Sequence, residues 1–410
     1  MNLIYVILII FLTGCSNSSF TENEVIGTDR AENLVLSTII SDTTFKDLQT
    51  IIDQEKDGFI INLQNGYNYV FTDTLDLRNY KDGTINCNGA TISRPNSDVI
   101  STTLSTDYNG GSMITVENIP DAFEVGSKIV LAKGQSQDDL SSYSLVITNI
   151  TNNKIYMSDS FNESFPSGSH VIKNYKLISG LSSHIVGSSN PNITIKNCFF
   201  DGNARNNNMN YSWTLGGSIH LMGGKTSVIK DNYFYDQPNE TIIGHGFKIL
   251  DNYFKDLNGS AVHMSVHDNT KELNAESVIQ ENIIINMNQI SKGINGHSEG
   301  AITFSWGPGN LKILNNTFIS KSGNYGVMGF FFSSPTNGAE NLTFSNNYAE
   351  NFEYIIKVNE NFGEPMRGFN ITNNTFKDCG LNHLWFSQAA EFILVENNDL
   401  IGNTTLTTNR

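Results

Sequence analysis

The fold is decided by Ile229-Lys230-Asp231-Asn232-Tyr233-Phe234, which returns as Ile249-Leu250-Asp251-Asn252-Tyr253-Phe254. Each copy has an aliphatic residue, two polar residues, an asparagine, one spacer and then usually an aromatic residue. A period in the twenties to thirties is typical of a solenoid, in which every repeat adds one coil. Further copies occupy residues 279–284, 313–318, 344–349, 371–376 and 395–400, and a first copy at 195–200 has Cys198 at the asparagine position.

The repeated asparagines stand at positions 232, 252, 282, 316, 347, 374 and 398, with separations of 20, 30, 34, 31, 27 and 24 residues. The shortest step approximates one bare coil, so the longer steps carry inserted loops. Asparagine tolerates a left-handed backbone, and its amide can bond neighbouring backbone groups. We therefore expect each asparagine at the tight bend of a coil, in a ladder of stacked side chains with a structural role.

The composition excludes one class of partner. Lys and Arg number 25 against 41 Asp and Glu, for a net charge of −16, whereas a nucleic-acid binder needs a basic face. Low charge and few prolines suit an extracellular β protein with many tight turns. Cys87, Cys198 and Cys379 are far apart without metal-like spacing, so we expect buried small apolar residues and not a disulfide framework.

The first 14 residues are an apolar run that ends in Leu12-Thr13-Gly14-Cys15. This segment resembles the bacterial lipoprotein signal, which is cleaved before a cysteine that then carries the lipid. One departure is that neither Lys nor Arg precedes the apolar run. The alternatives are an ordinary signal peptide or a short anchor. The resemblance implies a membrane anchor at Cys15 and a location at the bacterial outer membrane or cell surface.

Three further regions follow the signal. Residues 15–42 are expected to be a flexible tether and residues 43–410 a single solenoid domain. Thr44-Phe45-Lys46-Asp47 reads as a helix N-cap box, and Phe45, Leu48, Ile51 and Ile52 share one helical face that can cover the open end of the first coil. Residues 113–175 read as an inserted antiparallel β module, with Asn152-Asn153 as a hairpin turn; an independent domain is the alternative.

A third short strand in each coil has a small residue followed by apolar, variable and apolar positions. Examples are Ser218-Ile219-His220-Leu221 and Ala261-Val262-His263-Met264. Alternation sends the flanking apolar residues into the core and the middle residue outward. Residues 241–244 are ambiguous in register, so their outward residue stays open. The predicted outward stripe consists of His220, His263, Thr303, Lys357 and Trp385.

Together these features resemble the right-handed parallel β-helix of the pectate-lyase-like superfamily, over residues 44–410 and most clearly over 192–400. The resemblance implies an all-β solenoid with an N-terminal capping helix and a substrate groove over the third strand, and it leaves the reaction open. Gly244-His245-Gly246 is similar to a polygalacturonase motif, but that family's aspartate pair and Arg-x-Lys are absent. The Lys and Arg of the related chondroitinase and alginate lyase family are absent as well.

Long loops beside the stripe carry aromatic and ionisable residues, as functional loops often do. The alternative is that these loops only cover the edges of the solenoid. Sugar rings stack on aromatic faces, and His or Lys can bond hydroxyls or move protons. The loop residues of interest are Arg205, Tyr211 and Trp213 before the His220 strand, His267, Asp268 and Glu272 after the His263 strand, His297 and Glu299 before the Thr303 strand, and Trp306 after it.

The favoured function is an extracellular enzyme that degrades a uronate-containing polysaccharide by β-elimination. His263 with His267 or His220 would supply the base and the acid. Lys357, Arg205 or a bound Ca²⁺ would neutralise the uronate carboxyl. A glycoside hydrolase is the alternative, with Glu299 and either Glu240 or Asp268 as its carboxylates.

Two readings from other classes remain. A non-catalytic surface lipoprotein could bind glycans through Trp213, Trp306 and Trp385. A structural solenoid could dock a partner or another copy of the chain on its last coil, because only a short polar tail without an evident capping helix follows residue 400.

Overall fold

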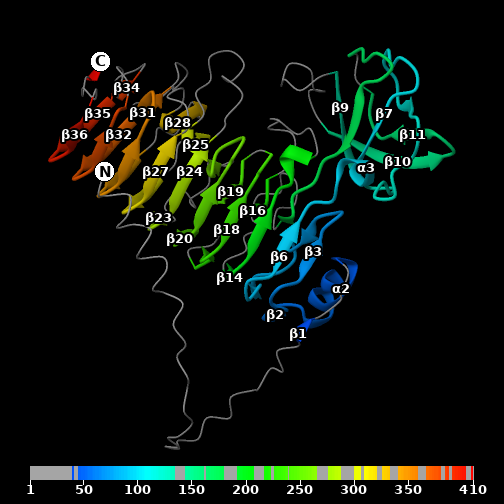
Figure 1. The fold of residues 1–410 in the computed structure, drawn as a ribbon, viewed down its shortest axis with the longest axis horizontal. Coiled ribbons are helices and arrows are strands. Elements are labelled where there is room, and N and C mark those ends of the chain that lie inside the picture. Colours follow the sequence, from blue (N-terminus) through cyan, green and yellow to red (C-terminus); the bar gives the residue numbers. More distant parts are fainter. Residues whose placement is uncertain are drawn as a thin grey trace, which may run out of the picture. The chain divides into compact units, whose positions relative to one another are not determined.

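The computed structural model describes residues 39–40, 45–133, 144–160, 163–179, 192–206, 217–222, 226–238, 240–265, 276–287, 300–305, 309–320, 326–332, 340–358, 366–379, 384–386, 390–402 and 408–409. Within these ranges the chain forms a right-handed parallel β-helix, as expected for an all-β solenoid. Each coil contributes one strand to each of three parallel sheets, here called sheets A, B and C (Figure 1). No helix among these residues is long and apolar enough to cross a membrane.

Strand order in each sheet follows the order of the chain. Sheet A contains β1 (Ile39–Ile40), β2 (Phe59–Leu63), β5 (Asp82–Asn86), β14 (Asn192–Lys196), β17 (Val228–Lys230), β20 (Lys248–Leu250), β23 (Ser277–Gln280), β26 (Gly309–Leu314), β29 (Glu340–Ser345), β32 (Met366–Thr372) and β35 (Ala390–Glu396). Sheet B contains β3 (Asn68–Val70), β6 (Thr91–Ser93), β15 (Phe199–Asp201), β18 (Tyr233–Tyr235), β21 (Tyr253–Lys255), β24 (Ile283–Met287), β27 (Thr317–Ser320), β30 (Tyr348–Glu350), β33 (Thr375–Lys377) and β36 (Asp399–Ile401). Sheet C contains β4 (Leu75–Asp76), β13 (Ile178–Ser179), β16 (Ile219–Met222), β19 (Ile242–His245), β22 (Val262–Ser265), β25 (Gly300–Ser305), β28 (Gly326–Phe332), β31 (Tyr354–Val358), β34 (Leu384–Phe386) and β37 (Thr408–Asn409).

The core is a set of apolar columns inside the coil. Phe200, Phe234 and Phe254 are fully buried at matching positions of sheet B. Their rings stack with centroid separations of 4.9 and 4.8 Å, close to the spacing of neighbouring strands. The repeat therefore places its second aromatic residue inside, and the residue before it, such as Tyr233, on the outer face.

The asparagine ladder is present at the bend between sheets A and B. The side-chain oxygen of Asn316 accepts bonds from both the backbone N–H and the Nδ2 of Asn282, each at 2.9 Å. Nδ2 of Asn282 also donates to the carbonyl of Ile249 at 3.0 Å. The same arrangement links each ladder asparagine to the next from Asn232 to Asn398. These side chains satisfy buried backbone groups that the tight bend would leave unpaired, so their role is structural, as expected.

The position of the left-handed residue differs from the expectation. The positive φ belongs to the residue before each ladder asparagine, for example Asp231 at 55° and Asp251 at 54°. Because the ladder asparagine uses its own side chain to bond the next coil, the sharp bend falls on its neighbour. Asp236, Asp256 and Asp378 form a second series of left-handed turns beyond sheet B.

The cysteines also differ from the expectation. Cys87 and Cys198 form a disulfide, with a Cα–Cα distance of 4.7 Å and 111 residues between them in sequence. They lie on adjacent coils, because β5 pairs directly with β14, and the inserted segment accounts for the long separation. The backbone N–H of Cys198 donates to the side-chain oxygen of Asn232 at 3.0 Å, so Cys198 occupies the first position of the ladder. Cys379 is buried and unpaired by disulfide, as expected for a small apolar residue.

Helix α2 (Phe45–Glu55) forms where the sequence predicts a capping helix, and Leu48 and Ile52 of its expected apolar face are buried. Thr44, its expected N-cap residue, lies outside the described residues, as do the signal segment and most of the tether. Residues 39–40 of the expected tether form β1. Helix α3 (Ser97–Ile100) begins an excursion within the second coil, between β6 and β13.

The excursion contains an antiparallel sheet with its own apolar core. The hairpin of β10 (Leu145–Thr151) and β11 (Lys154–Met157) turns at Asn152, which has a φ of 50°. The sheet includes a strand before residue 113, so the module extends further toward the N-terminus than the alternation indicated. Its other strands are β7 (Ser101–Thr103), β8 (Met113–Thr115), β9 (Lys128–Ala132) and β12 (His170–Lys173).

Candidate functional site

The outward stripe on sheet C is one continuous column of paired positions. His220 pairs with Ile243, Ile243 with His263, and His263 with Thr303. The column includes every residue of the predicted stripe, and Ile243 fills the coil whose register was ambiguous. In coil order its members are Asp76, Ser179, His220, Ile243, His263, Thr303, Gly329, Lys357, Trp385 and Asn409.

The side chains of this column differ in accessibility. His220 and His263 are partly exposed, while their strand neighbours Leu221 and Met264 are buried in the core. Thr303 is fully buried, and its hydroxyl bonds to that of Ser260, so it is not the accessible position that the alternation predicted. Asp76 and Ser179 of the column are partly exposed as well, and Nε2 of His220 is itself buried.

A buried hydrogen-bonded pair joins the column to the segment just before β19. Nδ1 of His263 contacts a carboxylate oxygen of Glu240, and only 14% and 9% of the two side chains are exposed. Burial alone would raise the pKa of the Glu240 carboxyl, but His263 and the charge of Lys176 outweigh it, so this pKa lies below its ordinary value. A carboxylate bonded to Nδ1 fixes the orientation and tautomer of an imidazole, and it assigns proton exchange to Nε2.

Lys176 is a second ionisable residue near Glu240 whose pKa is shifted. Burial lowers the pKa of Lys176 to about 8, against the raising effect of the Glu240 carboxylate. Lys176, Gly217 and Glu240 each stand two residues before the matching isoleucines of β13, β16 and β19. A Cβ at Gly217 would overlap the carbonyl oxygen of Glu240, so glycine allows these coils to approach closely.

Arg94 holds the segment that carries Lys176. Its guanidinium is buried, lies 4.6 Å from the centre of the Tyr175 ring, and donates to the carbonyls of Tyr175 at 3.1 Å and Gly217 at 3.0 Å. These contacts fix the backbone directly before the lysine and that of the next coil at Gly217. Lys176 was not identified from the sequence. Glu240 was considered only as a carboxylate of the alternative hydrolase.

Arg205, an expected substrate-binding residue, has partners on the next coil. It lies in a 3₁₀ turn (Ala204–Asn206) after β15, and its guanidinium contacts the Tyr235 hydroxyl and a carboxylate oxygen of Asp236 at 3.3 Å. Its guanidinium carbon is 4.6 Å from the centre of the Tyr235 ring. Arg205 is exposed, so these contacts leave it accessible from solvent.

The backbone positions of Lys357 and Trp385 are in the column by strand register. Several other expected site residues are not placed by the structure. Among the described residues, no cluster of three or more His, Cys, Asp and Glu side chains could hold a metal ion. Cys15, Tyr211, Trp213, His267, Asp268, His297, Glu299 and Trp306 lie outside the described residues.

Comparison with known proteins identifies no family. No family model matches the chain, and no curated protein matches it. Solved structures with similar folds include XylC in complex with xylose (12% identity, 82% of this chain, TM-score 0.43), of which this chain spans 63%. PfbA, a surface adhesin of Streptococcus pneumoniae, is 13% identical over 85% of this chain and 72% of its own, with a TM-score of 0.44. Polygalacturonase from Erwinia carotovora ssp. carotovora is 10% identical over 95% of this chain and 100% of its own, with a TM-score of 0.41. At these values the similarities do not bear on the reaction or the substrate.

Proposed function

We propose that this chain is a polysaccharide-degrading enzyme that cleaves a uronate-containing glycan by β-elimination over the outer face of sheet C. The observation that carries the proposal is the buried pair of His263 and Glu240 at the centre of the column. A buried carboxylate that orients a partly exposed imidazole is an arrangement suited to general base catalysis. Ionisable groups with pKa values shifted by burial and by specific partners, such as Lys176 and Glu240, gather more often at functional sites than elsewhere.

In the proposed reaction Nε2 of His263 takes the proton from the carbon beside the uronate carboxyl. The electrons of that C–H bond form a C=C bond, and the C–O bond to the glycosidic oxygen breaks. The departing oxygen takes a proton from His220, which lies two coils away, roughly 10 Å along the sheet from backbone to backbone. Lys176, when protonated, would neutralise the uronate carboxylate and so stabilise the carbanion-like transition state.

The pairing of Glu240 with His263 supports elimination, while Glu299 and Asp268, the partners named for a hydrolase, lie outside the described residues. A glycoside hydrolase needs two carboxyl groups about 5–9.5 Å apart across the scissile bond. Within the described column, Asp76 is the one carboxylate, and its coil lies three strand spacings, roughly 14 Å, from that of Glu240. Glu240 itself is paired with His263, whereas a catalytic acid has to hold a proton of its own.

The proposal includes an extracellular location with a lipid anchor at Cys15. Its support is the sequence Leu12-Thr13-Gly14-Cys15 together with the Cys87–Cys198 disulfide, since disulfides persist mainly in oxidising compartments. Labelling with a radioactive fatty acid in a bacterial host, with Cys15→Ala as the control, tests the anchor. Absence of label on the original chain would contradict it.

One assay tests the reaction. The chain is incubated with a panel of uronate-containing and neutral polysaccharides, with and without Ca²⁺. We expect ultraviolet absorbance from an unsaturated product with a uronate polymer. We also expect His263→Ala to lower the rate by about 10²–10⁴-fold, the range for loss of a general base. His170→Ala, at an exposed histidine in the inserted module, is the matched control and should leave the rate unchanged.

Three outcomes would contradict the proposal. New reducing ends without absorbance would indicate a hydrolase. Binding without either signal would indicate a glycan-binding protein. An activity that His263→Ala leaves intact would remove the assigned base.

A further inference from the structure

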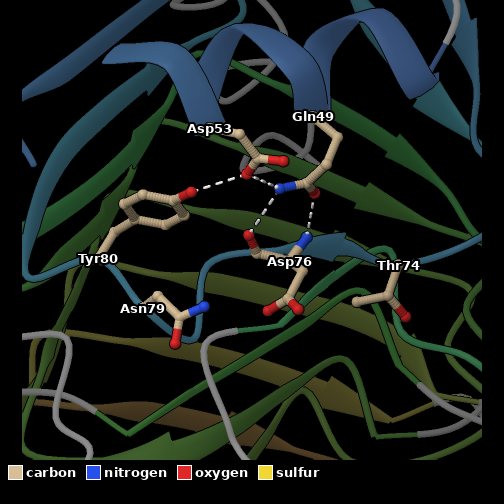
Figure 2. A pocket seen from close by; sticks show the side chains of 6 residues that line it. All are labelled: Gln49, Asp53, Thr74, Asp76, Asn79 and Tyr80. Atoms are coloured by element: carbon tan, nitrogen blue, oxygen red, sulfur yellow. Dashed lines mark hydrogen bonds between the residues drawn. The ribbon is translucent and has the colours of Figure 1, made fainter. Parts of the chain in front are cut away.

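A second polar site lies at the start of the column, between helix α2 and the first coil. A hollow of about 280 Å³ is lined by side chains that are all polar or aromatic (Figure 2). This volume is near the lower end of small-molecule pockets, which begin at about 300 Å³. The lining residues are Gln49 and Asp53 from α2, Thr74 and Asp76 at β4, and Asn79 and Tyr80 after it.

Part of this arrangement completes the fold. The Gln49 amide accepts from the backbone N–H of Asp76 at 2.7 Å and donates to its carbonyl at 3.1 Å, so it pairs with the edge of sheet C as another strand would (Figure 2). The Tyr80 hydroxyl donates to Oδ1 of Asp53 at 2.7 Å, and Gln49 Nε2 donates to the same oxygen at 2.9 Å. These bonds hold the walls of the hollow in place.

Other groups in the hollow are not used by the fold. Within the part of the chain that the structure describes, the Thr74 hydroxyl, the Asn79 amide and Oδ2 of Asp53 have no hydrogen-bond partner. They provide donors and acceptors within one small space bordered by the Tyr80 ring. Several hydrogen-bonding groups converging beside an aromatic ring can fix a ligand that carries many hydroxyls.

The charge of the hollow selects among such ligands. It contains the carboxylates of Asp53 and Asp76, and Asp76 is paired with Arg78, whose Nε lies 2.8 and 2.7 Å from its two oxygens. A uronate placed here would bring another carboxylate against Asp53, whereas a sugar hydroxyl would donate a charge-assisted hydrogen bond to it. The hollow therefore favours a neutral sugar over a uronate.

We infer that the hollow is a binding subsite for a neutral sugar unit of the glycan. Its place in the column supports this assignment, because Asp76 pairs with Ser179, and Ser179 with His220, on the same face. The inference rests on the proposed function in that it takes the glycan to run along sheet C. It makes the substrate a heteropolymer with a neutral unit about four coils from the uronate at His263.

Calorimetric titration of the full chain with short neutral oligosaccharides of xylose, glucose and galactose, and with oligogalacturonate of equal length, tests the inference. We expect at least one neutral probe to bind, and Asn79→Ala or Thr74→Ala to weaken its binding about tenfold, the effect of one or two lost hydrogen bonds. Asn149→Ala, at an exposed asparagine of the inserted module, is the matched control. Both hollow substitutions remove side chains that have no hydrogen-bond partner among the described residues, so folding should not be affected.

The inference is overturned if no neutral probe binds, if Asn79→Ala and Thr74→Ala bind the probe as the unmodified chain does, or if Ca²⁺ alone occupies the hollow. His263→Ala separates this result from the proposed function, since it should abolish elimination and leave binding of the neutral probe unchanged. Neutral binding that depends on Asn79, combined with no unsaturated product from any polymer, would support the subsite and reject the lyase.

Discussion

Replacing Glu240 by Gln tests the central pair most directly. The substitution keeps the size and one acceptor oxygen, and it removes a charge that is 91% buried, given the 9% exposure of the side chain. Leaving one member of a buried pair without its partner costs about 3–5 kcal/mol when the remaining charge persists. A neutral imidazole leaves no such charge behind, so the loss is that of its hydrogen bond to the carboxylate. We therefore expect the free energy of unfolding to fall by about 1.5–3 kcal/mol at neutral pH, the range for a charged hydrogen bond.

The pH dependence of this effect has a defined sign. The pKa of Glu240 is lower in the folded chain than its ordinary value of 4.5. Its stabilising contribution is therefore fully present above pH 4.5 and is lost as the pH falls through the folded value. The stability difference between the original chain and Glu240→Gln should shrink in that acid range.

Urea unfolding at several pH values, followed by circular dichroism, measures this difference. Glu276→Gln is the matched control, because Glu276 pairs with Lys312 at 2.7 Å while the two side chains are 50% and 47% exposed. That pair should contribute less than about 1 kcal/mol. Equal losses for the two variants, or a loss at Glu240 that does not change with acid pH, would refute the assignment of a buried charge pair.

Three further predictions concern other parts of the chain. The unmodified chain should become more stable between pH 8 and 10.5, because Lys176, with a folded pKa of about 8, loses its proton in the folded chain before it does in the unfolded chain. Lys176→Met should remove this rise in urea unfolding, and an unchanged pH profile would contradict the prediction. Asn282→Ala should lower the unfolding free energy by about 2–4 kcal/mol, because it leaves buried backbone groups of two coils unpaired. Asn149→Ala is the control and should be nearly neutral in the same measurement. Reduction of Cys87–Cys198, or replacement of both by Ser, should cost about 2–5 kcal/mol by thermal or urea unfolding, and an unaffected transition would show that the bond is absent.

The repeat made much of the fold predictable. Because Asn232, Asn252 and their counterparts stand at one bend of each coil, they set the register of the strands that follow, and the column through His220 and His263 was predicted from them. Strand alternation alone could not identify Thr303 as buried, since its burial depends on contacts made by the residues around it.

The partners within the site were not predictable in the same way. Glu240 reaches His263 from the preceding coil, and Lys176 lies two coils before Glu240. The contact with His263 and the electrostatic effect of Lys176 therefore both depend on how coils of unequal length stack. One signal was available: Lys176, Gly217 and Glu240 all stand two residues before an inward isoleucine. The disulfide was missed for a related reason, because 111 residues separate cysteines that are neighbours across one strand spacing.

The excursion within the second coil, between β6 and β13, also sets an order of folding. In the repeats beyond residue 226, a strand finds its partner within a few tens of residues, whereas β5 must wait for β14, which begins 110 residues after it. Closing short loops costs less entropy than closing long ones, so we expect nucleation in the later coils and late docking of β2–β6 together with the capping helix. During synthesis the ribosome releases Cys87 long before Cys198, so an oxidising catalyst would encounter Cys87 as a lone thiol. The Cys87–Cys198 bond would then form last and hold the N-terminal end of the solenoid in place.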